Sequence, residues 1–169
     1  MQPSVAVIMG SASDRDVVAP AVAVLDEFGV ARQWRVLSAH RTPDATATFV
    51  RQAEAEGVRV FLCAAGGAAH LPGVVAALTV RPVIGLPVRG ASLGGLDSLL
   101  SIAQMPPGVP VATVGVDAAR NAGLLAVAIL ALGDEELEAR LRQFRARQAE
   151  RVLSSGQDLE HPATGGARG

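Results

Sequence analysis

The chain alternates between short, β-branched apolar runs and longer segments with helical periodicity, and this alternation constrains its fold more than any other feature. Five runs have the length and near-continuous hydrophobicity of strands that are covered on both faces. They span residues 4–9, 33–37, 58–64, 82–88 and 111–116. Strands that alternate with helices form βαβ units, so the pattern predicts an α/β domain built around one parallel sheet.

The segments that separate these runs carry the signals of helix ends. We expect helices over residues 14–28, 43–56, 71–79, 96–103 and 118–132. Thr42 stands at an N-cap position before Pro43, and Gly29 and Gly57 stand where two helices should stop. Pro20 should kink the first helix or delay its start, because proline lacks the N–H that a helix interior needs.

Residues 134–152 predict a further, amphipathic helix. Leu137, Leu141 and Phe144 share one stripe, acidic residues begin the segment and arginines follow, in the order that the helix dipole favours. Such a helix usually packs as an arm on a neighbouring element or subunit. The polar, glycine-containing residues 154–169 predict a flexible tail. We therefore expect a single domain over residues 1–153, with the helical arm at 134–153.

Size and charge limit the classes of partner. A chain of 169 residues can bury a core as one domain without disulfides or metal. Its 15 basic residues are scattered and nearly balanced by 16 acidic ones, so we expect no nucleic acid partner. The most apolar window, residues 122–132, is too short to span a bilayer and predicts a buried helix, so we expect no membrane partner either.

The residue types that are rare or absent narrow the chemistry. Cys63 is the only cysteine and lies within an apolar run, which favours the role of a small buried hydrophobe. The sequence starts without the basic and apolar pattern of a signal peptide, which favours a cytoplasmic protein. The chain contains no lysine and no tyrosine, so Walker-type phosphate loops, Schiff-base nucleophiles and tyrosine proton donors are excluded.

Three polar motifs follow three of the predicted strands: Gly10 to Asp14 (GSASD), Ser38 to Pro43 (SAHRTP) and Gly66 to Gly73 (GGAAHLPG). All strand C-termini of an open parallel sheet lie along one edge, so the three loops should converge into one pocket. We expect the active site there.

Each motif also has a purely structural interpretation. In Gly10 to Asp14, hydroxyls beside a helix N-terminus suit a phosphate, but Ser13 or Asp14 could simply cap the helix. In Ser38 to Pro43, His40 can carry a proton near neutral pH and Arg41 can hold an anion, or the imidazole could be hydrogen-bonded in a loop beside a solvated arginine.

The third motif offers two interpretations as well. Four small residues precede His70, which lets a ligand lie against the backbone, whereas glycines in a tight turn would supply positive φ. Neither His40 nor His70 has a third ligand at metal-binding spacing, so we expect no metal site. The rigid loop over residues 104–110 could be a plain connector or a pocket wall.

Together and in this order, the three motifs, the segment at 96–102 (LDSLLSI) and the Gln104-Met105-Pro106 loop closely resemble one enzyme family. This is the catalytic subunit of bacterial phosphoribosylaminoimidazole carboxylase, better described as the class I PurE family of N5-carboxyaminoimidazole ribonucleotide mutases of de novo purine biosynthesis. The resemblance implies a flavodoxin-like three-layer α/β/α sandwich with a five-stranded parallel sheet. It also implies a homo-octamer without metal or organic cofactor, and a functional link to the ATP-dependent synthetase that makes the carbamate substrate.

The same resemblance implies a role for individual residues. His40 would transfer the proton and Asp14 would bind the ribose hydroxyls. The phosphate region would be held by Ser11, Ser13, Ser38 and Arg41. The base and the migrating carboxylate would be held by Gly66, Gly67, Ala68, His70 and Leu71.

Two rivals remain. One is the related carboxylase that uses aminoimidazole ribonucleotide and CO2 directly, although residues 96–110 look more like the mutase branch. The other is a non-catalytic flavodoxin-like module that binds a nucleotide, or a receiver domain. A receiver needs an aspartate at the end of its third strand, where this chain has Cys63-Ala64-Ala65, and aromatic residues that could flank a flavin are scarce.

Overall fold

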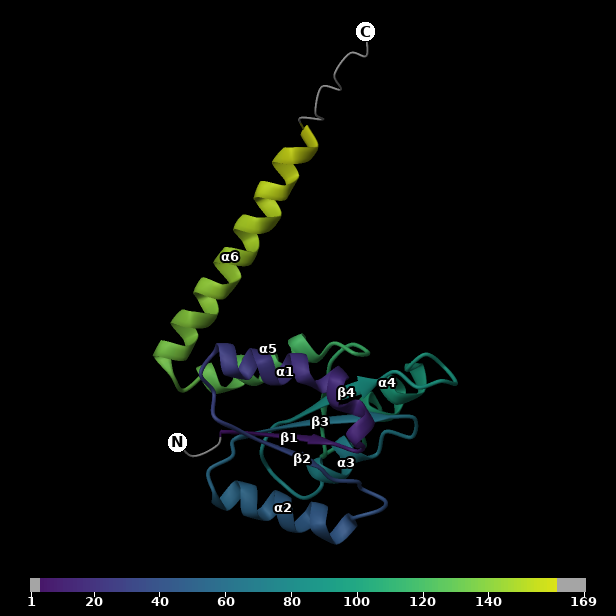
Figure 1. Cartoon of the computed structure of the whole chain (residues 1–169). Coiled ribbons are helices and arrows are strands. Elements are labelled where there is room, and N and C mark those ends of the chain that lie inside the picture. Colours follow the sequence, from purple (N-terminus) through teal and green to yellow (C-terminus); the bar gives the residue numbers. More distant parts are fainter. Residues whose placement is uncertain (1–3, 161–169) are drawn as a thin grey trace. The chain divides into compact units, whose positions relative to one another are not determined.

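A computed structural model describes residues 4–160 and contains a five-stranded parallel sheet (Figure 1). The strands are β1 (Val5–Met9), β2 (Arg32–Val36), β3 (Val60–Gly66), β4 (Val83–Val88) and β5 (Ala112–Thr113). Their spatial order is β2-β1-β3-β4-β5, and every neighbouring pair is parallel. This is the strand order of flavodoxin-like domains, so the predicted fold class is confirmed.

Helices cover both faces of the sheet (Figure 1). The elements that connect or follow the strands are η1 (Ala12–Asp14), α1 (Arg15–Glu27), α2 (Pro43–Ala55), α3 (Leu71–Ala76), α4 (Leu96–Ala103) and α5 (Ala119–Ala131). α5 packs tightly on α1, because a Cβ added to Gly123 would lie only 2.8 Å from the Ala21 carbonyl oxygen. The opposite face carries α2, α3 and α4.

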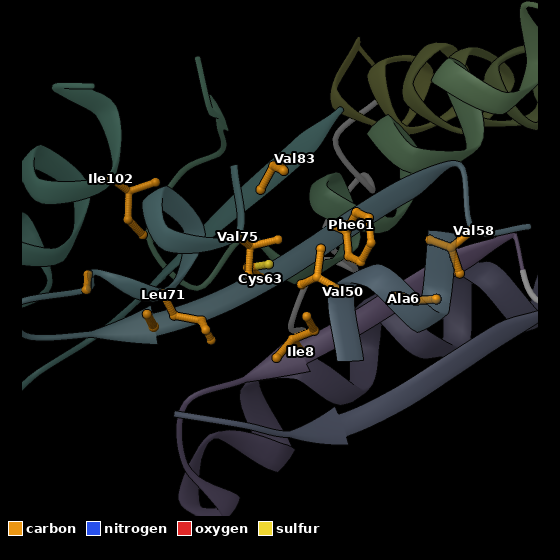
Figure 2. Close-up of a cluster of buried hydrophobic side chains, with 13 residues drawn as sticks. Ala6, Ile8, Val50, Val58, Phe61, Cys63, Leu71, Val75, Val83 and Ile102 are labelled. Carbon is orange, nitrogen blue, oxygen red and sulfur yellow. The ribbon is translucent and has the colours of Figure 1, made fainter. Parts of the chain in front are cut away.

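Successive side chains of the central strands point to opposite faces of the sheet, and both faces are covered, so these strands are apolar throughout. Ile8 of β1 and Phe61 of β3 point toward α2 and α3, where they meet Val50 and Val75 in a fully buried cluster (Figure 2). The intervening residues of β1 and β3 are also buried, so both faces of these strands need apolar side chains. Each large side chain buried in this way contributes about 1.5–3 kcal/mol relative to exposure.

Cys63 belongs to the same cluster and is fully buried, which confirms its predicted structural role (Figure 2). Burial raises the pKa of the Cys63 thiol well above its usual range, because an apolar interior disfavours the thiolate.

Several element ends differ from the sequence-based expectations. α1 begins at Arg15 and continues through Pro20, so the predicted delay of its start is wrong. α3 ends at Ala76 rather than at residue 79, and its last turn is closed by the Leu78 N–H, which donates to the Val75 carbonyl. β5 keeps only two residues, although the Val114 N–H still donates to the Gly85 carbonyl at 3.1 Å.

The chain divides into two compact units, residues up to Leu130 and residues from Ala131 onward. The second unit contains α6 (Glu135–Glu160), which Asp134 caps by accepting the Leu137 N–H at 2.9 Å. α6 extends beyond the predicted end at residue 152 and continues through Gly156, although glycine disfavours a helix interior. Residues 154–160 of the expected tail are therefore helical, and the remainder of that tail lies outside the described residues.

None of the helices within residues 4–160 combines the length and hydropathy of a membrane span.

Candidate active site

The three polar motifs meet at the carboxyl edge of the sheet, at the end of β1, which lies between β2 and β3. The strand ends are joined by backbone hydrogen bonds, since Gly10 N–H donates to Ala64 at 3.2 Å and Leu37 N–H donates to Met9 at 3.0 Å. Such a point of reversed strand order is where open α/β sheets bind ligands. A cavity of about 440 Å³ occupies it, which is within the usual size range for small-molecule sites.

Most of the predicted site residues line this cavity. They are Ser11, Asp14, Ser38, His40, Arg41, Gly66, Ala68, His70 and Leu71. Ser13 and Gly67 belong to the same loops but do not line it. Ala69, which sequence reasoning placed in the pocket wall, lines it as well. Sequence reasoning did not single out Gly10, Ala39 and Ala65, which also line it, and their position inside or directly beside the motifs could have indicated them.

The first loop orders its hydroxyls without using the carboxylate as a cap. Ser11 caps η1 by accepting the Ser13 N–H at 3.3 Å. The Ser13 hydroxyl donates to the Ser11 hydroxyl at 2.8 Å and to the Asp14 carboxylate at 3.2 Å. Asp14 precedes α1 and makes no side-chain capping bond. The interpretation of Asp14 as a simple helix cap is therefore wrong.

The second loop is held by hydrogen bonds among Ser38, Arg41 and Thr42. Thr42 stands at the N-cap position as predicted, but its hydroxyl donates to the Ser38 carbonyl at 3.0 Å and accepts the Ser38 N–H at 2.9 Å instead of capping α2. Arg41 donates from Nη2 to the Gly10 carbonyl at 2.8 Å and from Nε to the Ser38 hydroxyl at 3.3 Å. The guanidinium thus connects the first and second loops, which a merely solvated arginine would not do.

The third loop is a tight turn with unusual backbone angles. Ala69 N–H donates to the Gly66 carbonyl at 3.2 Å, and φ is +63° at Gly67 and +48° at Ala69. A left-handed alanine costs about 1–2 kcal/mol, so the surrounding structure must hold it in place. Ala69 is only 5% exposed, and this conformation presents His70 to the cavity. The turn interpretation of the glycines is correct for Gly67.

The two loop histidines contact one another. His40 Nε2 lies 2.7 Å from His70 Nδ1, and the rings are nearly perpendicular, with an interplanar angle of 85° and centroids 4.9 Å apart. A hydrogen bond between two imidazoles needs one N–H and one lone pair, so the bonded pair carries at most one positive charge. The contact allows a proton to move between the two rings.

The remaining predicted features lie elsewhere. Gly108, Val109 and Pro110 of the loop at 104–110 line a second cavity of about 520 Å³, together with residues that precede β4. Among the residues that the structure describes, no group of three His, Cys, Asp or Glu side chains could hold a metal ion.

Known proteins resemble this chain over most of its length. Residues 4–151 match the family described as AIR carboxylase. The chain belongs to the AIR carboxylase family. It is 54% identical over 143 residues to the N5-carboxyaminoimidazole ribonucleotide mutase of Pyrococcus abyssi, covering 85% of this chain and 82% of that protein. It is 52% identical over 162 residues to the enzyme of the same name from Mycobacterium tuberculosis, covering 96% and 93%.

The solved structures support the same fold. The crystal structure of Treponema denticola PurE has a TM-score of 0.87 to this AIR carboxylase family member and 28% sequence identity, covering 94% of this chain and 99% of that one. The three motifs that form the cavity lie within the span that matches the family, because the first begins at Gly10 and the third ends at Gly73.

Proposed function

We propose that this protein is a mutase of de novo purine biosynthesis, which converts N5-carboxyaminoimidazole ribonucleotide to the 4-carboxy isomer. The observation that carries the proposal is the hydrogen-bonded pair of His40 and His70 inside a cavity that also offers Arg41 and Asp14. The extensive identity to enzymes named as this mutase supports it.

The nucleotide would bind across the first two loops. Its phosphate would accept hydrogen bonds from Arg41 and from the hydroxyls of Ser11 and Ser38, close to a helix N-terminus whose partial positive charge favours anions. Ser13 would support this contact by donating to the Ser11 hydroxyl. The Asp14 carboxylate makes no capping bond, so besides the Ser13 hydroxyl it can accept from the ribose hydroxyls. The base would then lie toward the third loop and the two imidazoles.

His40 would act first as an acid and then as a base. As imidazolium it donates a proton to the carbamate nitrogen, the N–CO2 bond breaks and CO2 is released. Carbon C4 of the ring then forms a bond to this CO2, and neutral His40 removes the C4 proton. The two proton transfers cancel, so His40 regains its starting state without outside reactants. His70 would orient the His40 ring and accept or return its proton.

The third loop would retain the CO2 between these steps. Gly66 and Ala68 place backbone and small side chains on the cavity wall, and Leu71 adds an apolar one. Confinement keeps the CO2 close to C4 and converts recapture into an effectively intramolecular step.

A direct comparison of substrates tests the proposal against the carboxylase alternative. The purified protein is given either the N5-carbamate nucleotide or aminoimidazole ribonucleotide with bicarbonate, and the C4-carboxylate product is measured. We expect product from the carbamate without ATP, at a higher rate than from the amine with millimolar bicarbonate. A higher rate from the amine and bicarbonate would favour the carboxylase, and no product from either would refute both.

A homo-octamer is part of the proposal. The most apolar helix, α5, does not offer the contact, because its Ala122, Ala126 and Val127 are fully buried. Exposed leucines lie instead on and beside α4: Leu93 is 62% exposed, Leu96 52% and Leu100 45%. A cluster of this kind is suited to contact between subunits. Light scattering should give eight times the chain mass, and Leu100→Asp should lower it; a monomer at micromolar concentration would contradict the octamer.

We also propose a cytoplasmic location and a functional link to an ATP-dependent synthetase. An N-carbamate readily loses CO2, so the enzyme that forms it should act in the same compartment. Cell fractionation and a coupled assay with such a synthetase test the two points, and recovery of the protein outside the cytoplasm would contradict the first.

A further inference from the structure

Asp97 carries a buried oxygen atom that the fold leaves without a partner. The residue lies in the first turn of α4, and its Oδ1 is buried with no hydrogen-bond partner within residues 4–160. A buried carboxylate oxygen is unfavourable unless it accepts a hydrogen bond. Asp97 lines neither of the two cavities described above.

The other carboxylate oxygen lies close to the third loop of the active site. A Cβ added to Gly90 would be 3.9 Å from Asp97 Oδ2 and 4.0 Å from the Gly67 backbone nitrogen. Gly90 therefore separates the carboxylate from the turn, and its missing side chain leaves space between them. The Gly67 N–H is not the donor that closes this turn, because that bond comes from Ala69.

The neighbouring residue fixes Asp97 relative to the turn. Ser98 is fully buried, and its hydroxyl donates to the Val88 carbonyl at 2.9 Å. Val88 is the β4 partner of Gly66, the first residue of the turn. The N-terminus of α4 is thus attached to the strand that supports the turn, so the position of Asp97 is set by the sheet.

We propose that Asp97 is a positioning residue that holds the turn at Gly66–Ala69 through a water molecule beside Gly90. This water donates to Asp97 Oδ2, the carboxylate oxygen beside Gly90, and accepts the Gly67 N–H. The bridge stabilises the left-handed Ala69 and so fixes both His70 and the wall that retains CO2. Its catalytic consequence rests on the proposed function, whereas its effect on the turn does not.

Two substitutions at Gly90 test the bridge while leaving Asp97 intact. The Cβ that either substitution adds lies at ordinary contact distances from its nearest atoms. Gly90→Ala fills the space and excludes the water, whereas Gly90→Ser supplies a hydroxyl that can replace it. We expect amide hydrogen exchange of a peptide containing residues 67–70 to rise about tenfold in Gly90→Ala and to stay within about threefold of the parent in Gly90→Ser.

Substitutions of Asp97 separate this role from a general effect on α4. Asp97→Asn removes the negative charge but keeps an acceptor oxygen, whereas Asp97→Ala removes both. We expect Asp97→Ala to lower kcat about tenfold, with KM within about threefold, and to release more aminoimidazole ribonucleotide per product formed, because CO2 escapes. Asp97→Asn should keep kcat and this ratio within about threefold of the parent.

Gly115→Ala serves as the matched control, because its new Cβ would lie 3.5 Å from Ala118 Cβ, an ordinary contact. Equal exchange of the turn in Gly90→Ala and Gly90→Ser would overturn the proposal, as would equal effects of Asp97→Ala and Asp97→Asn. If the parent lacks mutase activity, the exchange experiment still decides whether the bridge exists.

Discussion

The alkaline stability of this protein should depend largely on one buried thiol. Cys63 is fully buried and its pKa is raised by desolvation, so the folded protein keeps the proton where an unfolded chain loses it. Below pH of about 8.5, the ordinary thiol pKa, both states hold the proton and pH has no effect through this group. Above it, the free energy of unfolding should fall by about 1.4 kcal/mol per pH unit.

The composition makes this effect unusually easy to isolate. The chain contains no lysine and no tyrosine, so the groups that normally titrate above pH 9 are absent. Between pH 7.5 and 10.5 the loss through Cys63 should reach about 2.7 kcal/mol. Urea unfolding at several pH values, at one protein concentration and with a reductant, measures it. The matched variant is Cys63→Ala, which should be less stable at pH 7.5 but should lose this slope. An equal slope in both proteins would refute the reasoning.

Three further outcomes are expected. Arg41→Ala should weaken substrate affinity by about 10- to 150-fold, the equivalent of about 1.5–3 kcal/mol for a charge-assisted phosphate contact. Arg35→Ala is the exposed control. An unchanged KM in Arg41→Ala would contradict the role assigned to Arg41. Gly85→Ala should lower the free energy of unfolding, measured with urea, by about 1–3 kcal/mol, because its Cβ would lie 2.3 Å from Ile102 Cγ2. A change of less than about 0.5 kcal/mol, as is usual for surface substitutions, would contradict this prediction. EDTA should leave turnover intact, and activity that disappears with the chelator and returns with a divalent ion would disprove the metal-free mechanism.

The parts of the fold that depend on local pattern could be predicted from the sequence. The apolar runs that alternate with helical segments predicted the order of the strands along the chain. The position of each polar motif directly after a strand predicted that its loop lies at the carboxyl edge of the sheet. Thr42 illustrates the limit: the residue type indicates an N-cap, but the Ser38 backbone lies close enough to take its hydroxyl. Likewise, no local signal shows that β5 would pair over only two residues or that α6 would extend to Glu160.

The contacts between loops could not be predicted, because they depend on the spatial order of the strands. β2 and β3 lie on either side of β1, and the loops that follow them must approach each other across its end. The hydrogen bond between His40 and His70 and the bond from Arg41 to Gly10 both arise from this arrangement. Residues thirty positions apart in the sequence carry no shared pattern that would indicate such a contact.

The most direct test of the account is the turnover of His40→Asn. Asparagine can keep a hydrogen bond to His70 but cannot transfer a proton at neutral pH, so the variant should fold and bind the nucleotide while losing nearly all conversion of the N5-carbamate to the C4-carboxylate. Circular dichroism and equilibrium binding establish the first two points, and the product assay measures the third. Turnover within about tenfold of the parent, a barrier change of only about 1.4 kcal/mol, would contradict the assignment of His40 and make His70 the candidate acid and base.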